Sequence, residues 1–293
     1  MTDKPLSSLI AADIGNSAIK LGRFQLSPGG DRSGGDLDGP VAEVAITVAN
    51  REAMGSPEKV NSSANLPGRW LAQIPSTAQR WYAASVNGPL ERKLASWVRR
   101  TRPHDQYVLL RHQHFPLKVD VRFPERVGTD RLAAAVAVNA LRSPARPAIV
   151  IDAGTAVTID AVAADGLFLG GVILPGLEAA AAALANNTQA LPRLQQFQLS
   201  SPPVSIGKST AEAIHAGILW GTVGAIREHI SRMAAELSSD PEIYCTGGAG
   251  DCLVGHLGRE FQFHSNLVLR GIALAGLHQK QSTENEQGSV EQS

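Results

Sequence analysis

Apolar and polar positions follow the same order in two separate parts of the chain. An apolar run at 9–10 leads into a polar turn at 12–18 and a second β-prone run at 19–21. The run at 148–150 leads into a similar turn at 151–157 and then into another β-prone run. Each copy predicts a strand, a tight turn and a second strand. Two related halves, each headed by one copy, follow from this repeat.

The remaining pattern predicts strands and helices mixed in both halves, and hence an α/β fold with mixed sheets flanked by helices. Beyond the two hairpins, strands are expected at 41–48, 80–86, 107–110, 167–174 and 242–245, and helices at 90–101, 131–141, 177–186, 209–237 and 265–278. Loops are expected at 27–40, which is rich in Gly and Ser, and at 55–68. The turn residues at 143–147 place the domain boundary, giving domains 1–146 and 147–278. A polar tail at 279–293 is expected to be disordered.

The long helix at 209–237 has an unusual surface. Ile214, Ile218, Ile230 and Met233 form one apolar stripe, and Trp220 lies close to it in sequence. Glycines at 217, 221 and 224 lower helix propensity, so we expect them to permit close packing against another element. Together these residues present more apolar surface than one flank of a single domain readily buries. The helix therefore predicts a homodimer.

Composition narrows the class of protein. The 293 residues carry 27 basic and 27 acidic side chains, which gives no basic face for a nucleic acid partner. Two cysteines form no disulfide framework, so a reducing cytoplasm is expected. The N-terminus does not have the pattern of a signal peptide, and no apolar run is long enough for a membrane span. We therefore expect a cytoplasmic protein without membrane or nucleic acid partners.

The two hairpins carry chemistry suited to phosphate groups. Asp13 and Asp152 each end a strand, with a glycine two residues on that lets a ligand approach the backbone. Asn16, Ser17 and Thr155 offer small polar groups that can hold phosphate oxygens. Either carboxylate could coordinate a cation. A lone Asp-x-Gly hairpin is also ordinary turn chemistry, so this pairing alone leaves both interpretations open.

A second motif, at residues 128–131, reads Gly-Thr-Asp-Arg and opens a predicted helix. Asp130 lies near the helix N-terminus, where the dipole favours its charged form. That carboxylate could accept a proton from a substrate hydroxyl, while Arg131 neutralises charge beside it. The alternative is that Thr129 or Asp130 is simply an N-cap.

Three other features are weaker candidates. His112 and His114 could ligate a metal, although no Cys or acidic partner stands at metal spacing. Cys245 and Cys252 are better explained as small apolar groups than as a redox pair. The turn at 246–248, Thr-Gly-Gly after a buried strand, is similar to an adenosine-contacting turn but lacks the spacing of a dinucleotide fingerprint.

In this order, the motifs resemble the type III pantothenate kinases of the actin-like, sugar-kinase and heat-shock-ATPase superfamily. The resemblance runs from about residue 9 to residue 277. It is carried by the segments 13–17, 128–131, 152–158, 170–176, 191–192, 206–210 and 246–248. It implies two related actin-like (ribonuclease H-like) domains with a ligand cleft between them.

The resemblance also implies phosphorylation of pantothenate by ATP and a homodimer. Asp130 would be the general base. The ATP site would comprise Asp13, Ile14, Gly15, Asn16, Ser17, Ala18, Ile19, Lys20 and Thr155. Pantothenate would be held by Gly128, Thr129, Arg131 and Thr210. Asp13 would bind the divalent metal, Mg²⁺, that accompanies ATP, and Asp152 a monovalent cation, K⁺ or NH₄⁺.

Two departures and two alternatives accompany this prediction. Many family members carry a pocket Tyr where this chain has Val121, with Phe123 nearby, and the insert at 27–40 is longer than usual. A non-catalytic regulator of the Bvg accessory factor type could share the scaffold, as could another actin-like ATPase such as a chaperone or a sugar kinase. The three carboxylates Asp13, Asp130 and Asp152 favour catalysis, and the chain has no Walker loop.

Overall fold

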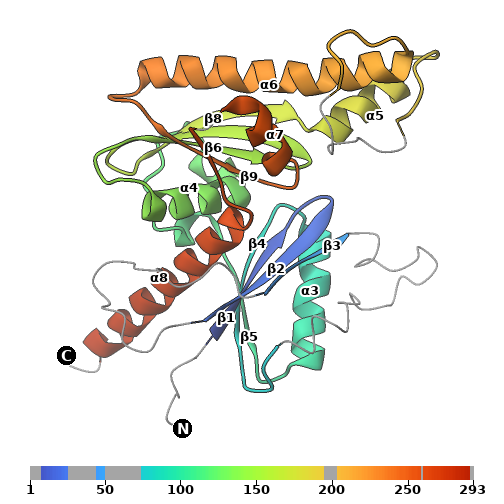
Figure 1. Cartoon of the computed structure of the whole chain (residues 1–293). Coiled ribbons are helices and arrows are strands. Elements are labelled where there is room, and N and C mark those ends of the chain that lie inside the picture. The colour runs from blue at the N-terminus through green and yellow to red at the C-terminus, as the bar shows by residue number, and fades with distance from the viewer. Residues whose placement is uncertain (1–7, 26–43, 50–73, 195–202, 259, 291–293) are drawn as a thin grey trace. The chain divides into compact units, whose positions relative to one another are not determined.

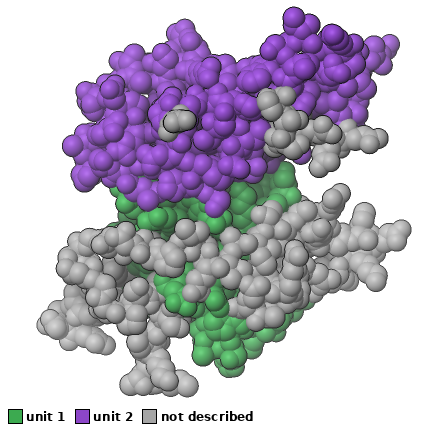
Figure 2. Space-filling model, viewed as in Figure 1, with its two compact units in different colours: residues 1–117, 122–140, 266–293 green, residues 118–121, 141–265 purple. Residues whose placement is uncertain are grey.

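The computed structural model describes residues 8–25, 44–49, 74–194, 203–258 and 260–290. The predicted loops at 27–40 and 55–68 lie outside these residues. The chain divides into two compact units (Figure 2). Unit 1 comprises residues 1–117, 122–140 and 266–293, and unit 2 comprises 118–121 and 141–265. The main part of unit 2 begins at residue 141, six residues before the expected start of the second domain at 147. The segment from residue 266 groups with unit 1, whereas we expected it in the second domain.

Unit 1 contains a five-stranded sheet in which the first strand is central. The strand order is β3-β2-β1-β4-β5. β1 pairs with β2 and β2 with β3 in antiparallel fashion, whereas β4 and β5 continue the sheet in parallel with β1. The bounds are β1 (Ser8–Ile14), β2 (Ala18–Gln25), β3 (Val44–Ala49), β4 (Arg80–Ser85) and β5 (Gln106–Leu109).

Helices cover both faces of this sheet. Alternate residues of β1, including Ile10 and Ala12, form a core with the apolar side of α3 (Gly88–Thr101). The opposite face packs against α8 (Leu267–Val290), where the absence of a Cβ on Gly276 lets the helix backbone approach the Tyr82 ring. The remaining described helical elements of unit 1 are η1 (His112–His114), η2 (Pro124–Arg126) and α4 (Thr129–Leu141).

α8 forms most of the C-terminal segment. The helix continues to Val290, well past residue 279, where we expected a disordered tail (Figure 1). Its glycines explain its docking, since a Cβ on Gly271 would overlap the Ala133 carbonyl of α4.

Unit 2 repeats the sheet topology of unit 1 with the order β8-β7-β6-β9-β10. β6, β7 and β8 are antiparallel neighbours, and β9 and β10 run parallel to β6. The strands are β6 (Ala148–Ala153), β7 (Ala156–Val162), β8 (Phe168–Pro175), β9 (Glu242–Thr246) and β10 (Phe261–Phe263), and the helices are α5 (Leu177–Asn187), α6 (Thr210–Glu236) and α7 (Gly250–Leu257). The predicted duplication of the two halves is therefore confirmed at the level of topology.

The long helix α6 corrects a second prediction. Ile214, Ile218 and Ile230 are buried in the core of unit 2, and Met233 packs against that core. The apolar stripe of α6 is thus part of the core of unit 2. A Cβ at position 217, 221 or 224 would meet nothing within 4 Å, so in the described structure these glycines do not permit a close approach.

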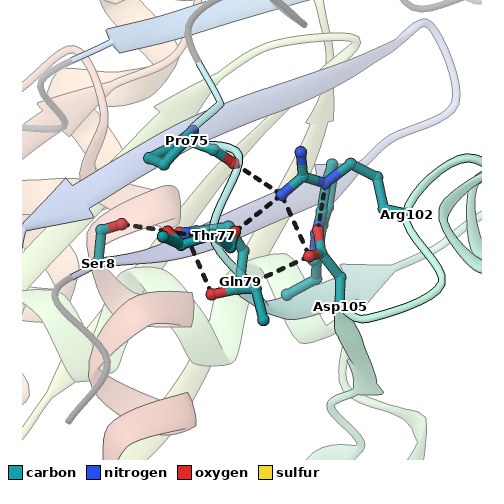
Figure 3. A network of polar contacts seen from close by, with 8 residues as sticks. Ser8, Pro75, Thr77, Gln79, Arg102 and Asp105 are labelled. Carbon is teal, nitrogen blue, oxygen red and sulfur yellow. Dashed lines mark hydrogen bonds and ion pairs between the residues drawn. The ribbon is translucent and has the colours of Figure 1, made fainter. Parts of the chain in front are cut away.

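A buried polar network joins the amino-terminal ends of the parallel strands in unit 1 (Figure 3). Ser8 Oγ donates to Gln79 Oε1 at 2.7 Å, and the Gln79 backbone N–H donates to Asp105 Oδ1 at 2.9 Å. Arg102 Nε donates to Asp105 Oδ2 at 2.7 Å, and its Nη2 donates to the carbonyls of Pro75 and Thr77. This network fixes one end of the sheet and leaves the carboxyl ends of β1 and β4 for other roles.

Candidate functional site

Both aspartate hairpins form as predicted, and their surroundings are equivalent. Gly15 N–H donates to the Ala18 carbonyl at 3.0 Å, and Gly154 N–H donates to the Ala156 carbonyl at 2.9 Å. The residue after each aspartate accepts a bond from the segment that follows the neighbouring parallel strand. Val86 N–H donates to Ile14 O at 3.1 Å, and Ala249 N–H donates to Ala153 O at 3.0 Å. Each carboxylate therefore ends a central strand that is fixed on both sides.

The first hairpin combines a carboxylate with an ammonium. Asp13 Oδ2 lies 3.8 Å from Lys20 Nζ, and the two residues are direct partners in the β1–β2 ladder. Asn16 and Ser17 are exposed at the turn. Ile14 and Ile19, which the resemblance placed at the ATP site, are fully buried in the described structure.

Asp130 lies in the first turn of α4. The Gly128 carbonyl accepts the Leu132 N–H at 3.2 Å, which puts Gly128 at the N-cap position. Asp130 Oδ1 accepts the Arg131 backbone N–H at 2.8 Å. Thr129 Oγ1 donates to the Ser85 carbonyl at 3.4 Å. Neither Thr129 nor Asp130 is therefore the N-cap, and both side chains help to fix the start of the helix.

The segment after β4 joins these two parts of unit 1, and sequence reasoning missed it. Val86 donates to the end of β1, and its Cγ1 lies 3.8 Å from where a Cβ on Gly128 would be. The Val86 side chain is 40% exposed, so an apolar group is available beside the candidate base. Because β4 runs parallel to β1, its carboxyl end lies beside Asp13. This geometric rule could have identified the segment after β4 from the sequence.

In unit 2, the Asp152 carboxylate lies against a glycine turn. Asp152 Oδ1 is 2.5 Å from where a Cβ on Gly247 would be, and Gly247 has φ = +93°. Position 247 therefore requires glycine for its backbone conformation and for space. The negative charge of Asp152 also acts electrostatically on the nearby buried thiol of Cys245. Burial is the main cause that raises the pKa of Cys245 to about 12, and the nearby Asp152 carboxylate adds to it.

The remaining predicted residues of unit 2 lie on exposed segments. Thr155 is exposed at the second hairpin, and its carbonyl accepts the Gly176 N–H at 3.1 Å. Thr210 is exposed at the first residue of α6, where Ser209 Oγ accepts the Glu212 N–H at 3.2 Å. Asp152, Thr155 and Thr210 thus belong to unit 2, whereas Asp13, Lys20 and residues 128–131 belong to unit 1.

The position of the expected pocket tyrosine is occupied differently. A Cβ on Gly170 would lie 3.2 Å from Cγ1 of Val121, so Val121 packs on strand β8. Phe123 is 49% exposed, and the Arg126 guanidinium lies 4.7 Å from its ring centroid. Phe123 is therefore the accessible aromatic residue just before the Gly-Thr-Asp-Arg motif.

The weaker candidates gain no support in the described part of the chain. His114 Nδ1 accepts the Arg111 N–H, and partial burial, with Arg111 and His112 nearby, lowers the pKa of His114. No group of three or more potential His, Cys, Asp or Glu metal ligands occurs among the described residues. Cys245 and Cys252 are both free thiols, as predicted. Among the described helices, none combines the length and the apolar character needed to span a membrane.

The duplicated sheets and the paired carboxylate hairpins define an actin-like fold of the kind found in sugar kinases and related ATPases. A candidate 2-dehydro-3-deoxygalactonokinase from Sinorhizobium meliloti has the same fold, with a TM-score of 0.52 and 13% identity. That alignment covers 92% of this chain and 95% of the other.

Within that fold, the chain belongs to the type III pantothenate kinase family, whose sequence profile matches residues 9–232. It is 43% identical over 157 residues to a type III pantothenate kinase of Herminiimonas arsenicoxydans, a match covering 53% of this chain and 59% of the relative. It is 31% identical over 189 residues to a type III pantothenate kinase of Persephonella marina, a match that covers 64% of this chain and 72% of the relative. A type III pantothenate kinase from Rhodopirellula baltica is 44% identical over 151 residues, a match that covers 51% of this chain and 53% of the relative. The chain thus spans little more than half the length of the Herminiimonas and Rhodopirellula relatives.

Proposed function

We propose that this chain transfers the γ-phosphoryl group of ATP to the primary hydroxyl of pantothenate, forming 4'-phosphopantothenate in the first step of coenzyme A synthesis. The observation that carries the proposal is the carboxylate of Asp130, held at the start of α4 in a member of this family. Phosphoryl transfer depends mainly on positioning and charge neutralisation, which fixed hairpins and a helix terminus can supply.

Asp130 acts as the general base in this reaction. The O–H bond of the acceptor breaks and the proton passes to the carboxylate. The hydroxyl oxygen forms a bond to the γ-phosphorus, and the bond from that phosphorus to ADP breaks. Arg131 follows in the same helical turn and supplies positive charge beside the reacting groups. General-base catalysis of this kind contributes about 10²–10⁴-fold.

The first hairpin forms the nucleotide-phosphate side of the site. Lys20 places an ammonium beside the end of β1, and Asn16 and Ser17 present exposed polar groups at the turn. Asp13 supplies the hard oxygen ligand that suits Mg²⁺. When bound, the ion would neutralise phosphate charge. Thr155 at the second hairpin is a further nucleotide-binding residue in this proposal.

Asp152 holds a monovalent cation, K⁺ or NH₄⁺, in this proposal. Its carboxylate fits such an ion because it is a hard oxygen donor in a cradle that a Cβ at position 247 would fill. The bound cation would add positive charge near the transferred phosphoryl group. This requirement is separate from the divalent metal that accompanies ATP.

Residues 128–131 bind pantothenate in this proposal, and Thr210 is a further substrate-binding residue. Because the Thr129 hydroxyl is engaged with the Ser85 carbonyl, Thr129 contributes through its backbone. Val86 adds an exposed apolar side chain next to Gly128, suited to the branched aliphatic part of pantothenate. Phe123 takes the place of the usual pocket tyrosine.

We also propose a homodimer. The isoleucine stripe of α6 no longer supports it, because that stripe is internal core. The support is family membership and the outer side of α6, where Trp220 is 37% exposed between two exposed glycines. Light scattering at low micromolar concentration is expected to give about 62 kDa, twice the 30.9 kDa of one chain. A stable, active monomer would contradict this assembly.

A coupled assay of ADP release tests the function. We expect release that depends on pantothenate, together with a phosphorylated product that mass spectrometry identifies as 4'-phosphopantothenate. Hexoses and 2-dehydro-3-deoxygalactonate serve as control acceptors and are expected to give no release above background. Phosphorylation of a sugar would favour a sugar kinase. Absence of transfer to any acceptor would favour a regulatory protein on the same scaffold.

A further inference from the structure

Gly128 lies next to the carboxylate of Asp130 with no side chain between them. A Cβ on residue 128 would overlap Asp130 Oδ1, while the other nearest atoms, Asp130 Cγ and Val86 Cγ1, would lie at 3.5 and 3.8 Å. Gly128 is not among the described glycines with positive φ. An alanine backbone is therefore allowed at this position, and among the described residues the one steric conflict is with a carboxylate oxygen.

That oxygen has a defined place. Asp130 Oδ1 accepts the Arg131 backbone N–H at 2.8 Å, in the first turn of the helix where the dipole favours negative charge. Because a carboxylate is planar, fixing one oxygen on this donor also fixes the direction of the other. The two oxygens are thus not equivalent, since Oδ1 is committed to the helix.

We propose that Gly128 is a positioning residue for Asp130. The space left by its missing side chain lets Oδ1 sit on the Arg131 N–H, and Oδ2 is thereby the oxygen that accepts the proton of the acceptor hydroxyl. As that O–H bond breaks, the hydroxyl oxygen bonds to the γ-phosphorus and ADP departs. This inference rests on the proposed function, and it gives Gly128 a role other than the substrate contact that the family resemblance implied.

The substitution Gly128→Ala separates the two roles. The overlapping atom is the far end of a side chain, so Asp130 can rotate away and the fold is expected to persist. The carboxylate then loses its alignment, and a displacement of about 1 Å can cost roughly 10²-fold in rate. We expect kcat to fall about 10- to 100-fold while the KM for pantothenate stays within about twofold. A direct substrate contact would instead raise KM.

Gly88→Ala is a matched control, because Gly88 also lies at the start of a helix of unit 1. A Cβ there would meet only the flexible end of Arg92, at 3.4 Å. This variant is expected to keep wild-type kinetics. The double variant Gly128→Ala/Asp130→Asn is expected to match Asp130→Asn alone, because a displaced amide has no proton-accepting role to lose. The melting temperature of Gly128→Ala is expected to lie within a few degrees of the wild-type value.

A crystal structure of Gly128→Ala shows the position of the Asp130 carboxylate directly, without relying on an activity measurement. We expect the Asp130 side chain in another rotamer, without its bond to the Arg131 N–H. The inference is overturned by an unmoved carboxylate, by wild-type kcat, by a raised KM at unchanged kcat, by independent losses in the double variant or by failure to fold. These outcomes are distinct from failure of the proposed function, which would show as a wild-type enzyme inactive on pantothenate or as a fully active Asp130→Asn variant.

Discussion

Lys20 Nζ lies 3.8 Å from Asp13 Oδ2, across the ladder that pairs these two residues at the end of the first hairpin. The side chain of Asp13 is 12% exposed and that of Lys20 is 33% exposed. The two charged atoms are too far apart for a direct hydrogen bond and Lys20 is partly exposed, so we expect the pair to contribute little to stability. Its ammonium is instead accessible to an anionic ligand, which fits a role in binding phosphate.

The first prediction therefore concerns Lys20→Met. Loss of the ammonium removes positive charge from the nucleotide side, so we expect the KM for ATP to rise about tenfold, which corresponds to about 1.4 kcal/mol. The melting temperature should stay nearly unchanged. Steady-state kinetics at varied ATP concentration measure the effect. Arg232→Met, which breaks the exposed pair with Glu228 on α6, is the control and should change neither value. An unchanged KM for ATP would remove Lys20 from the site.

The hairpins were predictable from sequence because their signal is local. A buried strand, an aspartate, a glycine two residues on and a second strand follow one another without a break at 8–25 and at 148–162, and the structure forms both copies. Short elements were missed. α7 contains two glycines in eight residues, and β10 has only three residues, so neither carries a periodicity that a pattern can detect.

Long-range relationships could not be predicted in the same way. The stripe of α6 was visible, but an apolar stripe does not say whether its own domain or a partner buries it, and here unit 2 buries it. The assignment of α8 to unit 1 depends on Gly271 and Gly276 meeting α4 and β4, which lie far away in sequence. The fit between Gly128 and Asp130 depends equally on rotamers that a motif does not encode.

The second prediction tests Asp152. We expect activity to require K⁺ or NH₄⁺ and to fall when Na⁺ replaces them, because the site must match the size of the ion. Asp152→Ala should remove the dependence together with most of the activity. Initial rates measured in matched chloride salts at constant ionic strength decide the point. Equal rates in all salts would show that Asp152 does not hold the cation.

A third prediction concerns the polar network at the other end of the unit 1 sheet. The side chain of Asp105 is 2% exposed and accepts bonds from Arg102, Trp81 Nε1 and the Gln79 N–H. Asp105→Ala removes the carboxylate partner of the partly buried Arg102 and leaves the Trp81 Nε1 and Gln79 donors without their acceptor, so we expect a loss of about 3–5 kcal/mol in the free energy of unfolding. Chemical denaturation measures it, with Glu228→Ala on the exposed pair as control. A loss below about 1 kcal/mol would mean that the network is not tightly coupled.

The fourth prediction is a pH dependence in unit 2. The Tyr244 hydroxyl donates to Glu242 Oε2 at 2.7 Å, and this bond, followed by the bond from Ser143, lowers the pKa of Glu242 below its usual 4.5. A lowered pKa in the folded state stabilises the fold above pH 4.5, and that contribution is lost as the pH falls through the folded-state value. The stability difference between wild type and Glu242→Gln should therefore shrink as the solution is acidified from neutral pH. A constant difference across that range would contradict the assignment.

The most direct test of the account is the turnover of Asp130→Asn with ATP and pantothenate. The amide cannot accept the hydroxyl proton, so we expect kcat to fall about 10²–10⁴-fold while the variant keeps the wild-type melting temperature. The measurement is pantothenate-dependent ADP release by equal amounts of folded wild-type and variant protein. A variant that retains more than about a tenth of wild-type turnover would show that Asp130 only helps to fix the start of α4 and is not the base.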